Sequence, residues 1–262
     1  MRSGTISHVI VSVGGVDPGA GAGIGRDLLT LTALGAAVRM VGTAWTEQNA
    51  GGVLSVEPRA PAALEDALRW ALRPPVPGAV KVGMVPGPEH AAAVVRGLAR
   101  FDGPIVADPV LAASSGGALW QGPLDAVLDL LRRATLATPN ATEAALLAAR
   151  PVTTAAEAAA AALDLHRAGV PAVLIKGGHL GSVTDGGASI TDVLVTAHGE
   201  RRYTRPRVPG RSPRGTGCAL SSAIAVELAG GRGLEDAIER ATDWLAQQIA
   251  GAIEIDGERR LP

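Results

Sequence analysis

"HVIVSVGG" (His8–Gly15), followed by "VDPGAGAGIGRDLLTLTALG" (Val16–Gly35), decides the fold class of this chain. The first segment is a short apolar run, which is typical of a buried strand. After a glycine-rich turn, Ile24, Leu28 and Leu31 recur at helical spacing. The stretch therefore predicts a strand, a loop and a helix, the repeating unit of an α/β fold.

The same alternation continues along the chain. Apolar runs predict strands, helical patterns separate them, and residues 190–208 have the look of a hairpin; further helices are expected from near Gly215 and Leu234. The expected strands are 37–45, 78–85, 103–110, 135–139 and 171–178, and the expected helices are 61–72, 89–101, 124–134, 141–149 and 154–168. We therefore predict a mostly parallel sheet with helices on both faces, in a single domain over residues 1–262.

Composition excludes several classes of protein. The chain of 262 residues is 47% hydrophobic, enough for a sizeable core, and its net charge of −1 gives no reason to expect nucleic acid or an anionic membrane as partner. The segment "MRSGTISHVIVSVGG" is too short in its apolar part for a secretory signal and favours a first strand, and no stretch approaches the roughly 20 apolar residues of a membrane span. One cysteine excludes an internal disulfide framework. We expect a soluble cytoplasmic protein.

Polar side chains follow three of the predicted strands, where ligands bind in open α/β sheets. Asp108 lies in "ADPV", Asn140 and Glu143 in "TPNATE", and Lys176 in "KGGH". Carboxylates together with phosphates suit Mg²⁺, and a lysine neutralises phosphate. Each motif also has an ordinary interpretation, because Asp before Pro starts turns and Asn140 with Glu143 can cap a helix. Their convergence on one edge of the sheet favours a site.

Two glycine-rich segments indicate close approach of the backbone to a ligand. "GVDPGAGAGIG" (Gly15–Gly25) fails the spacing of a dinucleotide fingerprint, and the chain holds no G-K-[ST] phosphate loop. "RGTGC" (Arg214–Cys218) opens a predicted helix, whose first N–H groups and dipole favour an anion. A cysteine there is either a reactive thiol of lowered pKa or a small buried residue at a helix start. Spacing alone leaves both possibilities open.

Taken together, eight motifs in order along the chain resemble the hydroxymethylpyrimidine and hydroxymethylpyrimidine-phosphate kinases of thiamin synthesis, in the ribokinase-like superfamily. They are "VGGVDPGAGAGIGRDL", "TEQNAGGV", "VKVGMV", "VADPVL", "TPNATEAALL", "LIKGGH", "DVLV" and "GTGCALSSAIA". The resemblance covers about Val9 to Leu245. It implies a three-layer α/β/α fold, ATP with Mg²⁺ as phosphoryl donor, and a homodimer.

The resemblance also assigns site residues. The pyrimidine pocket matches Gly15, Asp27, Gln48 and Met84; the anion hole matches Gly215, Thr216 and Gly217 with Cys218; the phosphate and Mg²⁺ groups match Asn140, Glu143 and Lys176. Asp108 adds a second candidate carboxylate for the metal. We expect Asp27 and Gln48 to bind the aminopyrimidine edge, Met84 to pack on the ring, and the Cys218 thiolate to act as a base for the alcohol substrate.

The chain departs from the family pattern at several positions. Arg214 stands where a histidine is usual, and we expect it to add positive charge at the anion site; Glu47 replaces a small residue beside Gln48. "SSGG" (Ser114–Gly117) replaces "SGD", and the chain ends on "EIDGERRLP" instead of a Gly-His-rich segment. These departures bear on the choice of acceptor. A pyridoxal kinase of the cysteine-containing type, or a weakly catalytic pyrimidine-binding sensor, are the alternative interpretations.

Overall fold

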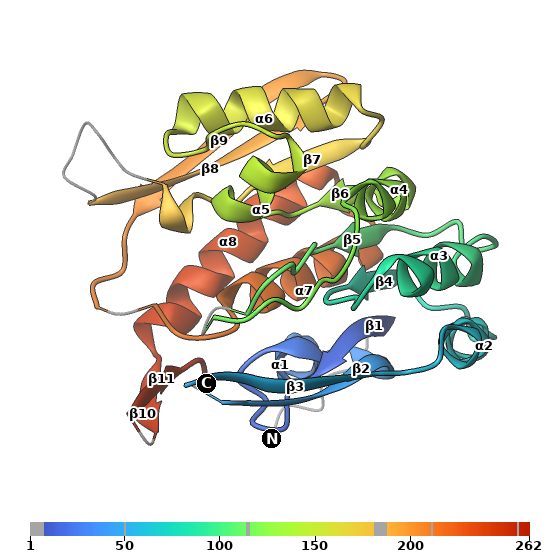
Figure 1. Cartoon of the computed structure of the whole chain (residues 1–262). Helices are drawn as coiled ribbons and strands as arrows, with labels where there is room; N and C mark the ends of the chain where they lie inside the picture. The colour runs from blue at the N-terminus through green and yellow to red at the C-terminus, as the bar shows by residue number, and fades with distance from the viewer. Residues whose placement is uncertain (1–7, 50, 114–115, 181–187, 211, 256) are drawn as a thin grey trace.

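The computed structural model describes residues 8–49, 51–113, 116–180, 188–210, 212–255 and 257–262. Within these residues one nine-stranded sheet runs through the molecule in the order β3-β2-β1-β4-β5-β6-β7-β8-β9 (Figure 1). Its strands are β1 (Val9–Val16), β2 (Ala37–Asn49), β3 (Gly52–Pro58), β4 (Ala79–Val82), β5 (Ile105–Ala107), β6 (Leu136–Ala137), β7 (Ala172–Ile175), β8 (Ser189–Thr196) and β9 (Gly199–Pro206). Residues 1–7, which precede the predicted first strand in the quoted N-terminal segment, and Ser114 and Ser115 of the "SSGG" departure lie outside the described residues.

Six neighbouring strands of the sheet are parallel, namely β2, β1, β4, β5, β6 and β7. The antiparallel strands β3, at one edge, and β8 and β9, at the other, complete the sheet. The helices are α1 (Gly23–Ala33), α2 (Pro61–Ala71), α3 (Pro88–Gly97), α4 (Asp125–Arg133), α5 (Ala141–Leu147), α6 (Ala155–Arg167), α7 (Thr216–Ala229) and α8 (Leu234–Ala250). The predicted mostly parallel α/β fold is confirmed.

Two hydrophobic cores separate the sheet from two layers of helices. Because successive residues of a strand face opposite sides, Val11 and Val13 pack with helices α2 to α6, whereas Ile10 packs with α1, α7 and α8. Strand β7 divides in the same way, with Val173 in one core and Leu174 in the other. The result is a three-layer α/β/α arrangement, as the family resemblance implied.

Three strands of the structure were not predicted from the sequence. Strand β2 runs on to Asn49, beyond the predicted end at Trp45, and pairs there with β3, all of whose residues are exposed or only partly buried. Near the C-terminus, β10 (Ile253–Ile255) and β11 (Glu258–Arg260) form a separate hairpin beyond the end of α8 (Figure 1). Short strands outside a buried sheet carry little apolar periodicity, so they leave little trace in the sequence.

None of the helices in the described part of the chain combines the length and the apolar character needed to cross a bilayer.

Candidate active site

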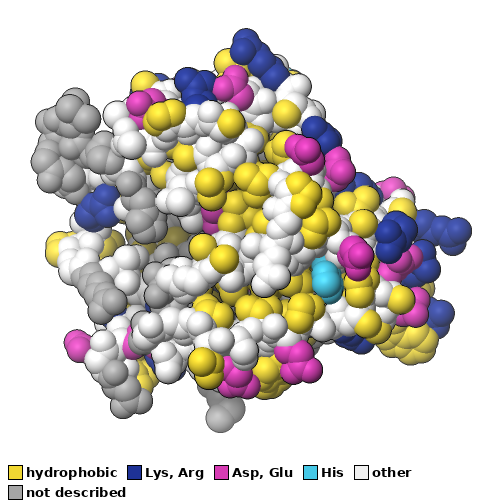
Figure 2. Space-filling model, viewed as in Figure 1, with side chains coloured by type: hydrophobic (Ala, Val, Ile, Leu, Met, Phe, Trp, Pro, Cys, Tyr) yellow, Lys and Arg dark blue, Asp and Glu magenta, His cyan; other side chains and the backbone are white. Residues whose placement is uncertain are grey.

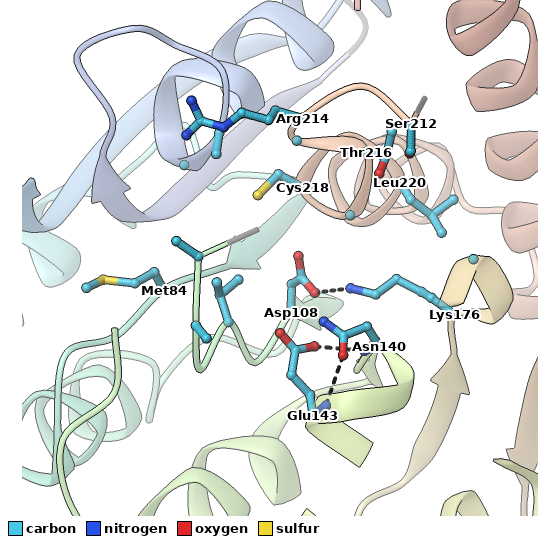
Figure 3. A pocket seen from close by; sticks show the side chains of 18 of the residues that line it. Met84, Asp108, Asn140, Glu143, Lys176, Ser212, Arg214, Thr216, Cys218 and Leu220 are labelled. Carbon is cyan, nitrogen blue, oxygen red and sulfur yellow. Dashed lines mark hydrogen bonds and ion pairs between the residues drawn. The ribbon is translucent and has the colours of Figure 1, made fainter. Parts of the chain in front are cut away.

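A cavity runs along the carboxyl edge of the sheet, where the parallel strands β1 and β4 to β7 end. It is lined from segments that follow β1, β4, β5, β6 and β7, together with the start of α7 and residues of β2, β8 and α8. On the face shown in Figure 2, hydrophobic side chains gather near the middle and charged ones lie mostly toward the edges. In the close view, Asp108, Asn140, Glu143, Lys176 and Cys218 surround a common space (Figure 3).

The cavity brings together all but one of the predicted site residues. Those that line it are Gly15, Gln48, Met84, Asp108, Asn140, Glu143, Lys176, Arg214, Gly215, Thr216, Gly217 and Cys218. Asp27 is not among the lining residues, because the protein buries it beneath the site. The strand-end positions were therefore a sound guide to which side chains meet.

The start of α7 forms one wall of the cavity. Gly215 caps the helix in a left-handed conformation, with φ of 76°, and its α-carbon packs so closely on the Gly21 carbonyl that no side chain fits. The N–H groups of Thr216, Gly217 and Cys218 belong to the first turn, where no carbonyl of the helix can accept them. A row of donors at the positive end of a 14-residue helix suits a phosphoryl group.

Lys176 and Asp108 face this helix start. The Lys176 Nζ lies 2.5 Å from Asp108 Oδ1, and a β-carbon placed on Gly217 would lie 3.1 Å from that Nζ (Figure 3). The lysine side chain is 14% exposed and opens to the cavity, whereas Asp108 is almost fully buried. A cation is thus fixed next to the free N–H groups of the helix, as binding of a multiply charged anion requires.

Asn140 and Glu143 begin helix α5 with a capping box. The Asn140 Oδ1 accepts from the Glu143 N–H at 2.9 Å, and Glu143 Oε2 accepts from the Asn140 N–H at 2.7 Å (Figure 3). The ordinary interpretation of this motif is therefore correct, and both residues also line the cavity. One turn of helix holds the amide and the carboxylate in place beside Asp108.

Burial raises the pKa of Glu143 to about 7; the charge of Lys176 opposes this shift and that of Asp108 reinforces it. A carboxyl group that burial leaves half-ionised at neutral pH is suited to bind a divalent cation. Within the described residues, no cluster of three or more His, Cys, Asp or Glu side chains is placed to hold a metal. A pair of carboxylates fits Mg²⁺, which takes few protein ligands and completes its shell with water and phosphate oxygens.

Cys218 corrects one expectation. Burial raises the pKa of its thiol to about 11; the charge of Lys81 opposes the shift, and Asp27 and Asp108 add to it. The predicted lowering of this pKa is wrong, because loss of water and two nearby carboxylates outweigh the helix start. Cys218 is 8% exposed and lines the cavity, so it is both the small buried residue of the alternative interpretation and a part of the cavity wall.

Asp27 is the second correction. Its carboxylate is fully buried, 2.9 Å from Lys81 Nζ, and accepts hydrogen bonds from the Ser12 and Ser222 hydroxyls at 2.7 and 3.0 Å. These partners come from β1, β4 and α7, and they take up the oxygens that a pyrimidine would need. Asp27 therefore ties α1 to three other elements, and the structure gives it no direct contact with the cavity.

Gly15, Gln48 and Met84 lie together at the end of the cavity nearest β1 and β2. A β-carbon on Gly15 would lie 3.1 Å from the Met84 sulfur, so the glycine leaves room for the thioether. The Gln48 Nε2 donates to Thr46 Oγ1 at 2.8 Å, and its Oε1 accepts from Arg214 at 3.2 Å. Glu47 is exposed and does not line the cavity, since neighbouring residues of a strand point to opposite faces.

Arg214 enters the cavity wall with its charge largely balanced. Its Nη2 lies 3.2 Å from Asp17 Oδ2, and its Nη1 lies 3.0 Å from Glu258 Oε1 on β11. The expectation of an added positive charge at the anion site did not include these two carboxylates. Asp17 sits in the quoted glycine loop and Glu258 in the quoted C-terminal segment, but nothing in the sequence pairs them.

The residues at the far end of the cavity, near β8 and β9, were not predicted from the sequence. Asp192 accepts from the Gly177 N–H at 2.7 Å and from Arg205 Nη1 at 2.6 Å. Four apolar side chains and two arginines complete the lining at this end: Ile190, Leu220, Leu245 and Ile249, with Arg205 and Arg207. Strand alternation in 190–208 marked which residues share a face but gave no sign that the hairpin reaches the site.

Comparison with known proteins decides the family. The model of the phosphomethylpyrimidine kinase family matches residues 17–261. The hydroxymethylpyrimidine/phosphomethylpyrimidine kinase of Rhizobium meliloti is 39% identical over 261 residues, which cover 98% of this chain and 96% of that protein. This chain belongs to the phosphomethylpyrimidine kinase family. Membership makes it an ATP-dependent kinase and confirms the resemblance seen in the eight sequence motifs.

Solved structures agree. The phosphomethylpyrimidine kinase of Clostridium difficile superposes with a TM-score of 0.78 at 28% identity, covering 93% of this chain and 99% of that one. The pyridoxal kinase of Staphylococcus aureus in complex with ADP gives 0.85 at 24% identity, covering 98% and 93%. The second likeness shows the fold alone, and the two neighbours together place the chain among ribokinase-like proteins.

Proposed function

We propose that this family member transfers the γ-phosphoryl group of MgATP to 4-amino-5-hydroxymethyl-2-methylpyrimidine and to its monophosphate. The order of groups along the cavity carries this proposal. Gly15, Gln48 and Met84 lie at the β1–β2 end, the β8–α8 residues lie at the other, and Lys176 with the α7 start lies between them. An acceptor and a nucleotide entering from opposite ends would meet at the helix start.

Each end suits its ligand. The wall near Gln48 and Met84 offers an amide and an apolar thioether side chain for a small polar ring. The opposite wall offers the apolar side chains of Ile190, Leu245 and Ile249 for a nucleobase. ADP in the Staphylococcus aureus neighbour and the kinase family support ATP as the donor.

The centre provides charge neutralisation, on which phosphoryl transfer mainly depends. The N–H groups of Thr216–Cys218 would hold the transferred group, and Lys176 would neutralise its developing charge. Asp108 and Glu143 would hold Mg²⁺, which supplies charge compensation for the phosphates. Since the pKa of Cys218 is about 11, the group is a protonated thiol at neutral pH, and it could take the alcohol proton only as the thiolate, if bound substrate lowered that pKa.

We further propose a cytoplasmic homodimer in thiamin synthesis, on the strength of family membership. Size-exclusion chromatography with light scattering tests the oligomeric state.

An assay of ADP formation with three acceptors tests the function. We expect turnover with hydroxymethylpyrimidine and with its monophosphate, and the weakest turnover with pyridoxal. Mass spectrometry of the products identifies the phosphorylated compound. ADP formation that is fastest with pyridoxal would overturn the proposal, as would ADP formation that no acceptor stimulates.

A further inference from the structure

Arg214 is held at the acceptor end of the cavity by groups from three distant parts of the chain. Besides Asp17 and Glu258, Gln48 accepts from its Nη2 at 3.2 Å. The guanidinium also packs on the glycine loop, since a β-carbon on Gly21 would lie 3.2 Å from Nη1. Arg214 is therefore a fixed part of the wall on which the acceptor lies.

The C-terminal hairpin supplies the carboxylate of Glu258. Strand β11 is fastened to the glycine loop by Arg260, whose Nη1 donates to the Gly19 carbonyl at 3.2 Å. The last residues are fastened as well, because Arg26 donates to the carbonyls of Leu261 and Pro262, each at 3.3 Å, and Leu261 is buried in a core. The hairpin thus closes over the loop that borders the acceptor end.

The charges of this network cancel. Arg214 and Arg260 carry two positive charges, and Asp17 and Glu258 carry two negative ones. Glu258 is 7% exposed and bridges the two arginines, with Oε1 near Arg214 and Oε2 2.9 Å from Arg260. Although burial acts to raise the pKa of Glu258, the hydrogen bonds and charges of the two arginines lower it, so the carboxylate is ionised at neutral pH.

Gln48 shows how the network reaches the acceptor. Arg214 only donates hydrogen bonds, so the amide of Gln48 turns its oxygen toward Arg214. The Thr46 hydroxyl donates its proton to the Val16 carbonyl at 2.8 Å, so it can only accept from the Gln48 nitrogen. Two independent contacts therefore set the orientation of a side chain that lines the cavity.

We infer that Glu258 is a specificity-determining residue: by holding and neutralising Arg214, it sets the preference of the site between an uncharged alcohol acceptor and its phosphorylated form. The inference rests on the proposed function. Glu258 acts through Arg214 and does not itself line the cavity, so it is a positioning residue.

The test compares kcat/KM for hydroxymethylpyrimidine and for its monophosphate in matched variants. Glu258→Gln keeps a hydrogen-bond acceptor and removes a negative charge, so we expect the ratio to shift about three- to tenfold toward the phosphorylated acceptor. Arg260→Gln removes a positive charge from the same network and should shift the ratio the opposite way, by less, because Arg260 is partly exposed. Glu254→Gln, an exposed position of the same hairpin, is the control and should leave the ratio unchanged.

If the hairpin had a purely structural role, the substitutions would lower kcat/KM for both acceptors equally and leave their ratio unchanged. If the wild type is active and both Glu258→Gln and Arg260→Gln keep the wild-type ratio of kcat/KM between the two acceptors, the inference is overturned and the proposed function stands. A wild type inactive on both acceptors overturns the proposed function and the inference with it. If Glu258→Gln fails to fold, Arg260→Gln decides by the sign of its shift.

Discussion

Two Asp–Lys ion pairs lie near Cys218, and they differ in what surrounds them. Asp27 and Lys81 are 2.9 Å apart, with side chains 0% and 1% exposed. Asp108 and Lys176 are 2.5 Å apart, with side chains 2% and 14% exposed, and both line the cavity. The same two residue types therefore form one sealed pair and one open pair within a single site region.

The difference shows that hydrogen-bond satisfaction, more than residue type, separates structural from functional charges. The Asp27 carboxylate already accepts from Lys81, Ser12 and Ser222, so it has little capacity left for a ligand. Lys176 and Asp108 lie beside unpaired helix N–H groups and Glu143, where an anion and a cation can still be added. The sealed pair should govern stability and the open pair catalysis.

Breaking the sealed pair should have the largest effect. Asp27→Asn leaves the buried Lys81 charge without its partner, which costs about 3–5 kcal/mol of unfolding free energy. Urea unfolding at neutral pH measures this, and Asp129→Asn, in an exposed pair with Arg132, should cost less than about 1 kcal/mol. Wild-type stability together with a raised KM for the acceptor would instead restore the direct binding role predicted from the sequence.

Breaking the open pair at Asp108 should reduce turnover while sparing the fold. Asp108→Asn removes a carboxylate that faces Lys176 and the α7 start, and we expect kcat to fall by about 10²–10³-fold. Steady-state ADP formation under saturating substrates measures the change. A variant within threefold of wild type would reduce Asp108 to the turn-forming residue of its ordinary interpretation.

Cys218 reports on the electrostatics between the two pairs. With a thiol pKa of about 11, its alkylation by iodoacetamide should be slow at neutral pH and rise about tenfold per pH unit, without a plateau below pH 9. Mass spectrometry follows the reaction without interference, since the chain holds one cysteine. A plateau near neutral pH would show the low pKa that the sequence suggested and this structure does not support.

The smallest effect concerns Glu143. Because its pKa is raised to about 7, Mg²⁺ competes with a proton, and the half-saturating Mg²⁺ concentration should fall about tenfold from pH 6 to pH 8. Glu143→Gln should weaken Mg²⁺ dependence and abolish this pH trend. An unchanged Mg²⁺ titration in Glu143→Gln would leave the residue a helix cap alone.

The raised pKa of Glu143 also affects the stability of the free protein. Stability decreases as pH rises from about 4.5 to about 7, because the folded state binds more protons than the unfolded state in this range.

The sequence predicted those site residues whose location follows from their position at the end of a strand. Asp108, Asn140 and Lys176 each follow a parallel strand, and parallel strands end at one edge, so their meeting follows from the pattern. The core followed from apolar periodicity in the same way. The edge strand β3 and the hairpin β10–β11 did not, because their residues are exposed or few.

Burial depth and long-range partners could not be predicted. Lys81 lies in an apolar run, and only the Asp27 carboxylate that α1 places against it explains a fully buried lysine there. The raised pKa of Cys218 depends on that same buried cluster. Glu258 meets Arg214 across 44 residues of chain, and a single sequence gives no sign of such a pair.

The contrast between the two pairs is tested most directly by measuring turnover and thermal unfolding on Lys176→Met and Lys81→Met together. For Lys176→Met we expect kcat to fall at least about 100-fold with the unfolding midpoint within a few degrees of wild type. For Lys81→Met we expect the midpoint to fall by about 6–20 °C, while the protein that remains folded keeps kcat within about tenfold of wild type. Equal losses of turnover and stability in both variants would contradict the separation of a sealed structural pair from an open catalytic one.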